Sequence, residues 1–124
     1  PYLHNEMEEY SEKLNGKLFS EVNPADFLNL IRNAEAIITD SFHAIVFSII
    51  FQKDFWCFGR NAGTYSMNTR LHTLLSYVEM QDRMIAPEDL KNRTHNTYVN
   101  IDLSNLKIKQ KESITFLSNA LEIL

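Results

Sequence analysis

The sequence predicts an α/β fold, with a Rossmann-like parallel sheet flanked by helices. Short segments rich in β-branched or aromatic residues, at 36–39 and 54–58, alternate with longer segments whose apolar residues recur at helical spacing. Residues 36–39 show no polar alternation, which is typical of a strand buried on both faces. Strands that alternate with helices usually pair in parallel through right-handed crossovers. Residues 1–124 are therefore expected to form a single domain.

The composition is that of an ordinary globular domain and excludes some functions. The chain has 124 residues, of which 44% are hydrophobic and 23% charged, with a net charge of −4. Its lysines and arginines do not gather into a basic stripe, which argues against a nucleic acid partner. The longest apolar run, residues 44–51, is far shorter than the roughly 20 residues of a membrane span. No integral membrane segment is expected, and residues 1–20 lack the apolar core of a signal peptide.

The single cysteine, Cys57, cannot form an internal disulfide. This suits a reducing compartment and predicts a cytoplasmic protein, at the inner face of the membrane or free of it. Because Cys57 lies among aromatic residues, and because free cysteine is one of the most buried residue types, its thiol is expected to be buried.

The first third of the chain is expected to begin with a polar lead-in, residues 1–16, as a short exposed helix that stops near Gly16. A short strand is expected at 17–20. Asn23 then reads as a helix cap, followed by Pro24 in the first helical turn. The apolar face of this helix would consist of Phe27, Leu30, Ile31 and Ala34.

The segment that follows predicts a strand at 36–39, a polar corner and a buried helix over 42–51. Asp40 or Ser41 can cap that helix. The β-branched residues within 42–51 leave a hairpin that turns at Asp40-Ser41 as an alternative. Such a turn favours Asn-Gly or Asp-Gly, and neither is present. Further along, the expected elements are a strand at 54–58, a polar loop at 60–66, a helix from Met67, an irregular segment at 81–96, an edge strand at 97–101 and a helix over 104–124.

His43 is the first candidate for chemistry. It lies just inside the N-terminus of the expected helix, beside N–H groups that have no intrahelical partner. That end of a helix favours carboxylate or phosphate groups, and an imidazole there can act as general acid or base. The alternative is that His43 merely caps the corner and packs on Phe42.

Arg60 and Arg70 flank the polar loop and can face the same edge of the sheet. Their guanidinium groups suit fork-like recognition of a carboxylate or phosphate. Solvated cations are the alternative, and Asn68 can be simply the cap of its helix. The histidines and Cys57 are too scattered for a metal site. Ser41 lacks the flanking glycines of a nucleophile elbow.

Several of these segments resemble the C-terminal part of polysaccharide pyruvyl transferase family proteins. The resemblance lies in residues 24–28 (PADFL), the corner 39–44 (TDSFHA), residues 53–55 (KDF), residues 68–75 (NTRLHTLL) and residues 82–83 (DR). It covers about residues 20–85 well and the final helix loosely. The family's usual corner sequence is TDSFHG, so that Ala44 stands here in place of a glycine.

The resemblance implies a two-domain protein of the GT-B glycosyltransferase kind, of which this chain is most of the C-terminal half. Relatives transfer the enolpyruvyl unit of phosphoenolpyruvate to a sugar, in the synthesis of bacterial exopolysaccharide or capsule. The implied partners are phosphoenolpyruvate, a sugar or lipid-linked glycan acceptor, and the missing N-terminal domain. No resident cofactor and no metal are expected, and the isolated chain should be inactive.

The resemblance also implies roles for individual residues. His43 would be the catalytic acid or base. The donor would contact Thr39, Asp40, Ser41, Phe42, Arg60, Asn68 and Arg70. Some relatives carry an arginine where this chain has Ser41, which removes one expected anion clamp. This departure leaves a nucleotide-sugar glycosyltransferase half-domain open as an alternative, and a non-catalytic scaffolding or dimerising module is a third.

Overall fold

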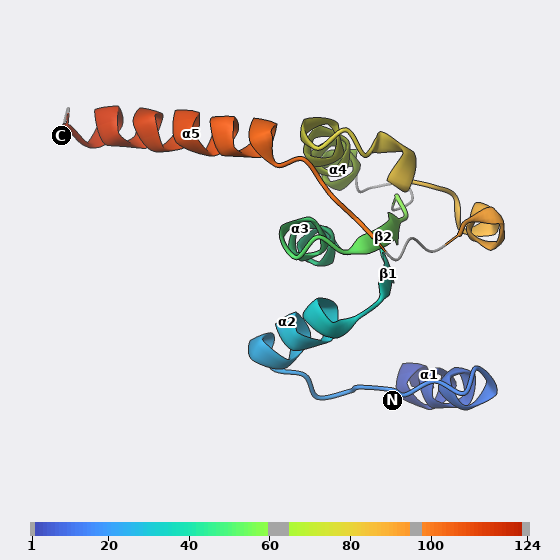
Figure 1. Ribbon diagram of the computed structural model, residues 1–124. Coiled ribbons are helices and arrows are strands. Elements are labelled where there is room, and N and C mark those ends of the chain that lie inside the picture. The colour runs from blue at the N-terminus through green and yellow to red at the C-terminus, as the bar shows by residue number, and fades with distance from the viewer. Residues whose placement is uncertain (1, 60–64, 95–97, 123–124) are drawn as a thin grey trace. The chain divides into compact units, whose positions relative to one another are not determined.

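The computed structural model describes residues 2–59, 65–94 and 98–122. It divides into two compact units, residues 1–30 and residues 31–124. The boundary between the two units falls inside a helix, α2 (Pro24–Asn33) (Figure 1). Each unit is described by itself below.

The first unit contains α1 (Tyr2–Lys13) and most of α2. Asn15 adopts a positive φ of 52° after α1, so the helix stops before Gly16 as expected. The Asn23 side chain accepts a hydrogen bond from the amide of Asp26 at 2.8 Å, which confirms the predicted cap. The strand expected at 17–20 is wrong, because these residues form no ladder. Instead, the Lys17 ammonium lies 4.9 Å from the centre of the exposed Phe19 ring.

The second unit is a small α/β structure. The strand β1 (Ala36–Thr39) and the strand β2 (Asp54–Cys57) are parallel, and α3 (Phe42–Ile50) connects them (Figure 1). The register places Ala36 opposite Asp54 and Thr39 opposite Cys57. The prediction of a parallel sheet with flanking helices is confirmed, and the hairpin alternative is wrong. The expected burial of β1 on both faces is also wrong, because Ala36 and Ile38 are exposed, Ile38 by 56%.

The rest of this unit follows β2. Its helices are α4 (Tyr65–Tyr77) and α5 (Ser104–Glu122), and two 3-10 turns lie between them, at Gln81–Arg83 and Pro87–Asn92. After the first turn, Met84 makes a parallel bridge to Cys57, and the amide of Ile85 donates to the Cys57 carbonyl at 3.0 Å. None of the helices in the described part of the chain is long and apolar enough to span a membrane.

The core of the second unit lies between the sheet, α3 and α4. Leu71 and Leu75 on α4 and Val78, the residue after its end, are buried and recur at helical spacing. The complete buried cluster is Ile45, Ile49, Phe55, Cys57, Leu71, Leu75, Val78 and Ile101. The helix α3 was expected to be buried on every side, but it is buried on one face only, and Ile50 is 53% exposed.

The edge strand expected at 97–101 is also wrong over its described part, residues 98–101. The side chain of Gln52 takes the place of a strand partner here. It accepts from the amide of Ile101 at 2.5 Å and donates to the carbonyl of Ile101 at 3.1 Å. A side-chain amide satisfies both backbone groups of Ile101, so this segment is anchored without a ladder.

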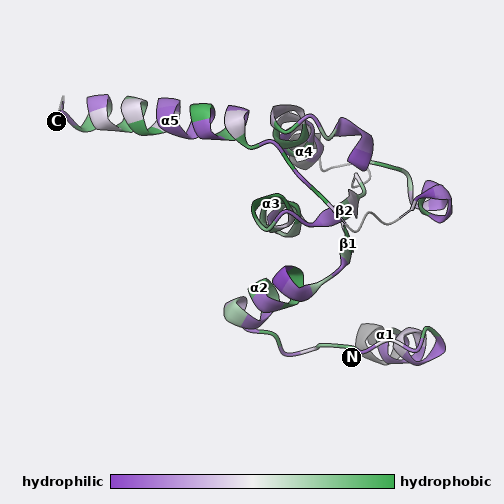
Figure 2. Cartoon of the chain, in the orientation of Figure 1, coloured by the Kyte–Doolittle hydropathy of each residue, from purple (hydrophilic) through white to green (hydrophobic). Residues whose placement is uncertain are grey.

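The helix α5 confirms the prediction of a C-terminal helix, over residues 104–122. Leu106 packs against the core, but residues 107–122 are all exposed. Figure 2 shows green, hydrophobic segments recurring along α5 between hydrophilic ones. An apolar helix face therefore reaches solvent over most of its length.

Burial of Cys57 is confirmed and has a consequence for stability at high pH. Its side chain is fully buried, and burial raises the pKa of the thiol from 9.0 to about 11. Between these values the unfolded chain loses the thiol proton while the folded chain keeps it, so stability falls as the pH rises. We expect a loss of up to about 3 kcal/mol from this group. Urea unfolding from pH 8 to 11 measures it, and Cys57→Ala should flatten the decline; an unchanged decline would contradict this assignment.

Candidate functional site

The corner between β1 and α3 is held by two hydroxyl side chains. Ser41 is the N-cap of α3, with φ −87° and ψ 123°, and its Oγ accepts from the amide of Ala44 at 3.4 Å. The Ser41 amide donates to Oγ1 of Thr39 at 3.0 Å. Asp40, between them, is exposed. Local hydrogen bonding of this kind is why a short polar sequence can end a strand and begin a helix.

His43 is the second residue of α3 and its side chain is exposed. Its ring meets the edge of the Phe42 ring, with centroids 6.1 Å apart and an angle of 85° between the planes. Ser41, and not His43, caps the helix. The amides of Phe42 and His43 belong to the first turn and have no intrahelical acceptor. The imidazole thus stands in solvent beside the positive end of the helix dipole.

The corner lies at the edge of the sheet where the parallel strands end. The amide of Phe58, just after β2, donates to the Thr39 carbonyl at 3.1 Å. Asn68, on α4, lies over this edge, since a methyl group placed on Gly59 would come 3.4 Å from its Oδ1. Asn68 is the fourth residue of α4, which begins at Tyr65, and is therefore not its N-cap. Carboxyl edges of parallel strands are the usual place for ligands in open α/β sheets.

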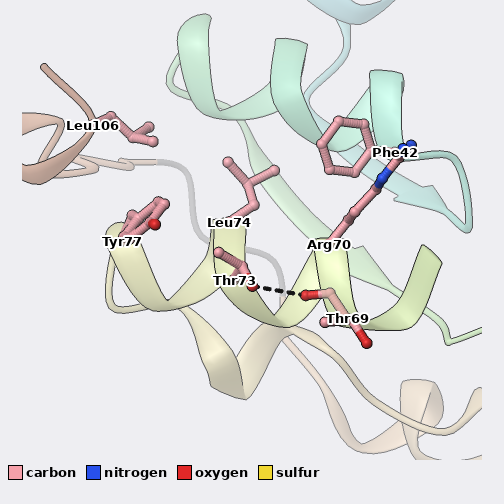
Figure 3. A pocket seen from close by; sticks show the side chains of 7 residues that line it. All are labelled: Phe42, Thr69, Arg70, Thr73, Leu74, Tyr77 and Leu106. Carbon is pink, nitrogen blue, oxygen red and sulfur yellow. Dashed lines mark hydrogen bonds between the residues drawn. The ribbon is translucent and has the colours of Figure 1, made fainter. Parts of the chain in front are cut away.

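A pocket of about 510 Å³ adjoins the corner between α3, α4 and the start of α5. Ligand pockets commonly have volumes of about 300 to 1,000 Å³. Figure 3 shows the Arg70 side chain extending from α4 toward Phe42. The pocket is lined by Phe42, Thr69, Arg70, Thr73, Leu74, Tyr77 and Leu106. The Arg70 side chain thus lines the pocket and extends its positive charge toward the corner.

The structure brings most of the predicted site residues to one edge of the second unit. Thr39, Asp40, Ser41, Phe42 and His43 form the corner itself, Arg70 reaches toward it, and Asn68 lies over the end of β2. Arg60 lies outside the described residues. The contributions of Tyr77 and Leu106 to the pocket were not predicted. The sequence indicates only that Leu74 and Tyr77, three residues apart, lie on one side of their helix. Among the residues that the structure describes, no histidine, cysteine or acidic side chains cluster as metal ligands would.

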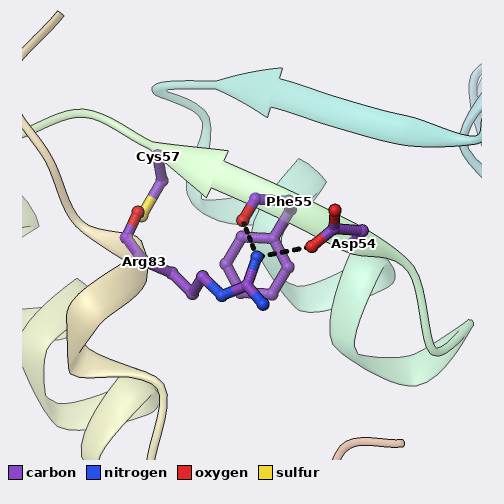
Figure 4. A network of polar contacts seen from close by, with 4 residues as sticks. All are labelled: Asp54, Phe55, Cys57 and Arg83. Carbon is purple, nitrogen blue, oxygen red and sulfur yellow. Dashed lines mark hydrogen bonds and ion pairs between the residues drawn. The ribbon is translucent and has the colours of Figure 1, made fainter. Parts of the chain in front are cut away.

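A second polar cluster, also not predicted, lies along β2 (Figure 4). Arg83 forms an ion pair with Asp54, the first residue of β2, and donates to the carbonyl of Phe55 at 3.3 Å. Its guanidinium also lies 4.4 Å from the centre of the Trp56 ring. Because Asp54 begins the strand whereas the corner lies where the strands end, this cluster holds the sheet and takes no part in the corner.

Comparison with known proteins agrees with the resemblance over residues 20–61 and does not extend to residues 68–75 and 82–83. The family model for polysaccharide pyruvyl transferase matches residues 3–61. This range includes the corner and both strands, and it extends nearer the N-terminus than the resemblance did. No curated protein and no solved structure matches the chain. Residues 3–61, a little under half of the chain, are thus similar to the polysaccharide pyruvyl transferase family.

Proposed function

We propose that this chain is most of the C-terminal, Rossmann-like half of a GT-B-type pyruvyl transferase. It would act in the synthesis of a bacterial exopolysaccharide or capsule, with phosphoenolpyruvate as the donor. One observation carries the proposal: an exposed His43 in the first turn of α3, with Arg70 reaching toward the same turn. The family match covers this corner.

The corner offers the groups that such a donor needs. Phosphoenolpyruvate carries a carboxylate and a phosphate, and both suit the amides at the start of a helix. The Ser41 Oγ accepts a hydrogen bond from the Ala44 amide, and its hydroxyl hydrogen can still donate a hydrogen bond to an anion. The Arg70 guanidinium can bind either charged group in a bidentate way. Thr39 and Asp40 shape the turn, and Arg60 and Asn68 complete the proposed donor site.

The chemistry assigned to His43 is proton transfer. An imidazolium donates its proton to the methylene carbon of phosphoenolpyruvate, and C2 becomes an oxocarbenium-like centre. A sugar hydroxyl attacks C2 and gives its proton to the imidazole. The bond from C2 to the phosphate oxygen then breaks, a second hydroxyl of the sugar closes the ketal, and its proton leaves with the inorganic phosphate. The helix N-terminus and Arg70 stabilise the negative charge of the leaving phosphate.

The acceptor is a glycan, as the family name implies, free or lipid-linked. In this proposal the acceptor side of the cleft is built by an N-terminal domain of the same protein. The 124-residue chain alone therefore binds the donor without transferring it. The reaction takes place in the cytoplasm or at the inner face of the membrane, where phosphoenolpyruvate is available.

A nucleotide-sugar donor is the second candidate, and Ser41 favours it. Some relatives have an arginine at this position, so the corner of this chain carries one cation fewer than theirs. A nucleoside diphosphate also suits a helix N-terminus, and its nucleoside part could occupy an apolar pocket. The two candidates share the scaffold and differ only in the donor.

Calorimetric titration of the chain separates the two donors. We expect phosphoenolpyruvate to bind and common nucleotide sugars to give no heat. Replacement Arg70→Gln should weaken phosphoenolpyruvate binding by about 10- to 100-fold, because a charge-assisted hydrogen bond is lost. Arg32→Gln is the matched control, since Arg32 is exposed on α2 and precedes the opposite end of β1. Binding of a nucleotide sugar alone, or equal effects of both replacements, would contradict the proposed donor site.

A further inference from the structure

Thr39, the last residue of β1, holds the corner through two of its oxygen atoms. Its carbonyl accepts a hydrogen bond from the amide of Phe58, just after β2, at 3.1 Å. Its side-chain Oγ1 accepts from the amide of Ser41 at 3.0 Å. The Thr39 side chain is half-buried. One residue therefore connects the end of β2 to Ser41, the N-cap of α3.

The hydrogen bond from the Ser41 amide to Thr39 Oγ1 closes a tight turn around Asp40. A threonine hydroxyl that accepts from the amide two residues further on takes the place of a backbone carbonyl in an ordinary turn. Beyond this turn Ser41 has the extended backbone that an N-cap needs, with φ −87° and ψ 123°. Thr39 therefore fixes the direction in which the chain leaves the strand and enters the helix.

The cap bond of Ser41 is weaker than its bond to Thr39. The Ser41 Oγ lies 3.4 Å from the Ala44 amide, whereas such bonds usually measure about 2.9 to 3.0 Å. The Ser41 amide lies at an ordinary 3.0 Å from Thr39 Oγ1. The position of Ser41 thus depends more on Thr39 than on Ala44. In the proposed donor site the Ser41 hydroxyl donates to the anion, so its orientation depends on Thr39 as well.

We propose that Thr39 is a positioning residue of the donor site, which acts on the anion through Ser41 and makes no contact of its own with the donor. This inference rests on the proposed function, and it gives Thr39 a different role from the donor contact that the family resemblance implies. Because Thr39 holds Ser41 in place before the donor arrives, the Ser41 hydroxyl and the first-turn amides need no reordering when the donor binds.

Replacement of Thr39 tests the proposal in the 124-residue chain. Valine has nearly the shape of threonine and lacks the hydroxyl, so Thr39→Val should raise the dissociation constant for phosphoenolpyruvate about tenfold in calorimetric titration. Thr39→Ser keeps the hydroxyl and should stay within about threefold of the wild type. Thr115→Val, at an exposed threonine of α5, is the matched control and should bind as the wild type does. Urea unfolding checks that each variant folds. A folded Thr39→Val variant with wild-type affinity would overturn the proposal.

A double variant separates positioning from direct contact. Ser41→Ala alone should raise the dissociation constant about tenfold, because a hydroxyl donor to the anion is lost. If Thr39 acts through Ser41, adding Thr39→Val should bring the total effect to about 10- to 30-fold, well short of the roughly 100-fold expected for two independent contacts. Effects that multiply to about 100-fold would show that Thr39 contacts the donor itself, and would overturn the positioning role.

Hydrogen exchange without any donor examines the turn separately from the proposed function. In Thr39→Val the Ser41 amide loses its acceptor, so it should exchange at least about tenfold faster than in the wild type. An unchanged exchange rate would overturn the positioning role even if phosphoenolpyruvate binds. A wild-type chain that binds no phosphoenolpyruvate, with Ser41 exchange accelerated as expected, would instead overturn the proposed function and the part of Thr39 in it.

Discussion

Under the proposed function, replacement of His43 with glutamine or alanine in the two-domain protein is expected to lower kcat for pyruvyl transfer by about 10²- to 10⁴-fold, the usual contribution of a general acid or base. The imidazole is exposed and makes only an edge contact with Phe42. The free energy of unfolding should therefore change by no more than about 0.5 kcal/mol. Affinity for phosphoenolpyruvate should fall little, because the first-turn amides and Arg70 remain.

Phosphate release under saturating donor and acceptor measures this effect, and urea unfolding measures the stability. His72→Gln is the matched control, because His72 is an exposed histidine on α4. The control should keep wild-type turnover. Turnover of the His43 variants within threefold of the wild type would contradict the acid–base role and leave His43 as a surface residue.

Replacement of Arg83 with methionine is expected to destabilise the fold by about 3 to 5 kcal/mol. The side chain of Asp54 is 0% exposed and that of Arg83 is 11% exposed. Without the arginine, a carboxylate stays buried beside a strand and loses its charged partner. Contacts with the Phe55 carbonyl and the Trp56 ring are lost as well. A small domain has roughly 5 to 15 kcal/mol of stability in total, so the loss is severe.

Urea unfolding of Arg83→Met measures the loss, and two further variants locate its cause. Adding Asp54→Leu should restore much of the stability, since a buried apolar pair at positions 54 and 83 then replaces a buried carboxylate that has lost its arginine. Lys109→Met removes an ion pair with Glu112 whose side chains are 50% and 59% exposed, and it should cost less than about 1 kcal/mol. An Arg83→Met loss as small as that of Lys109→Met would show that the ion pair does not hold the sheet.

The parts of the fold that could be predicted are those with local causes. Asn23 and Ser41 cap their helices through hydrogen bonds to residues three positions away. The run at 36–39 forms the predicted strand although one of its faces is exposed, and the polar corner after it is held by its own hydroxyl groups. The placement of His43 in the first turn of α3 followed from this local pattern.

The parts that could not be predicted depend on residues distant in the sequence. Arg83 meets Asp54 across 29 positions, and Gln52 meets Ile101 across 49. Sequence periodicity does not reveal contacts between residues so far apart. The segment at 98–101 was therefore predicted to be a strand, because its hydrogen bonds to the distant Gln52 side chain could not be foreseen. Tyr77 joins the pocket beside Arg70 only once α4 packs against α3. The expected burial of the whole of α3 was wrong because an apolar sequence does not show which of its sides lacks a neighbour.

The central claim is that the first turn of α3 binds an anionic donor beside His43. Nuclear magnetic resonance spectra of the 124-residue chain, recorded during titration with phosphoenolpyruvate, test this directly. We predict the largest saturable shifts at the amides of Phe42, His43 and Ala44 and at the His43 ring, with smaller shifts at the Arg70 side chain. Saturable shifts confined to residues away from this turn, or no shifts at millimolar donor, would contradict the claim.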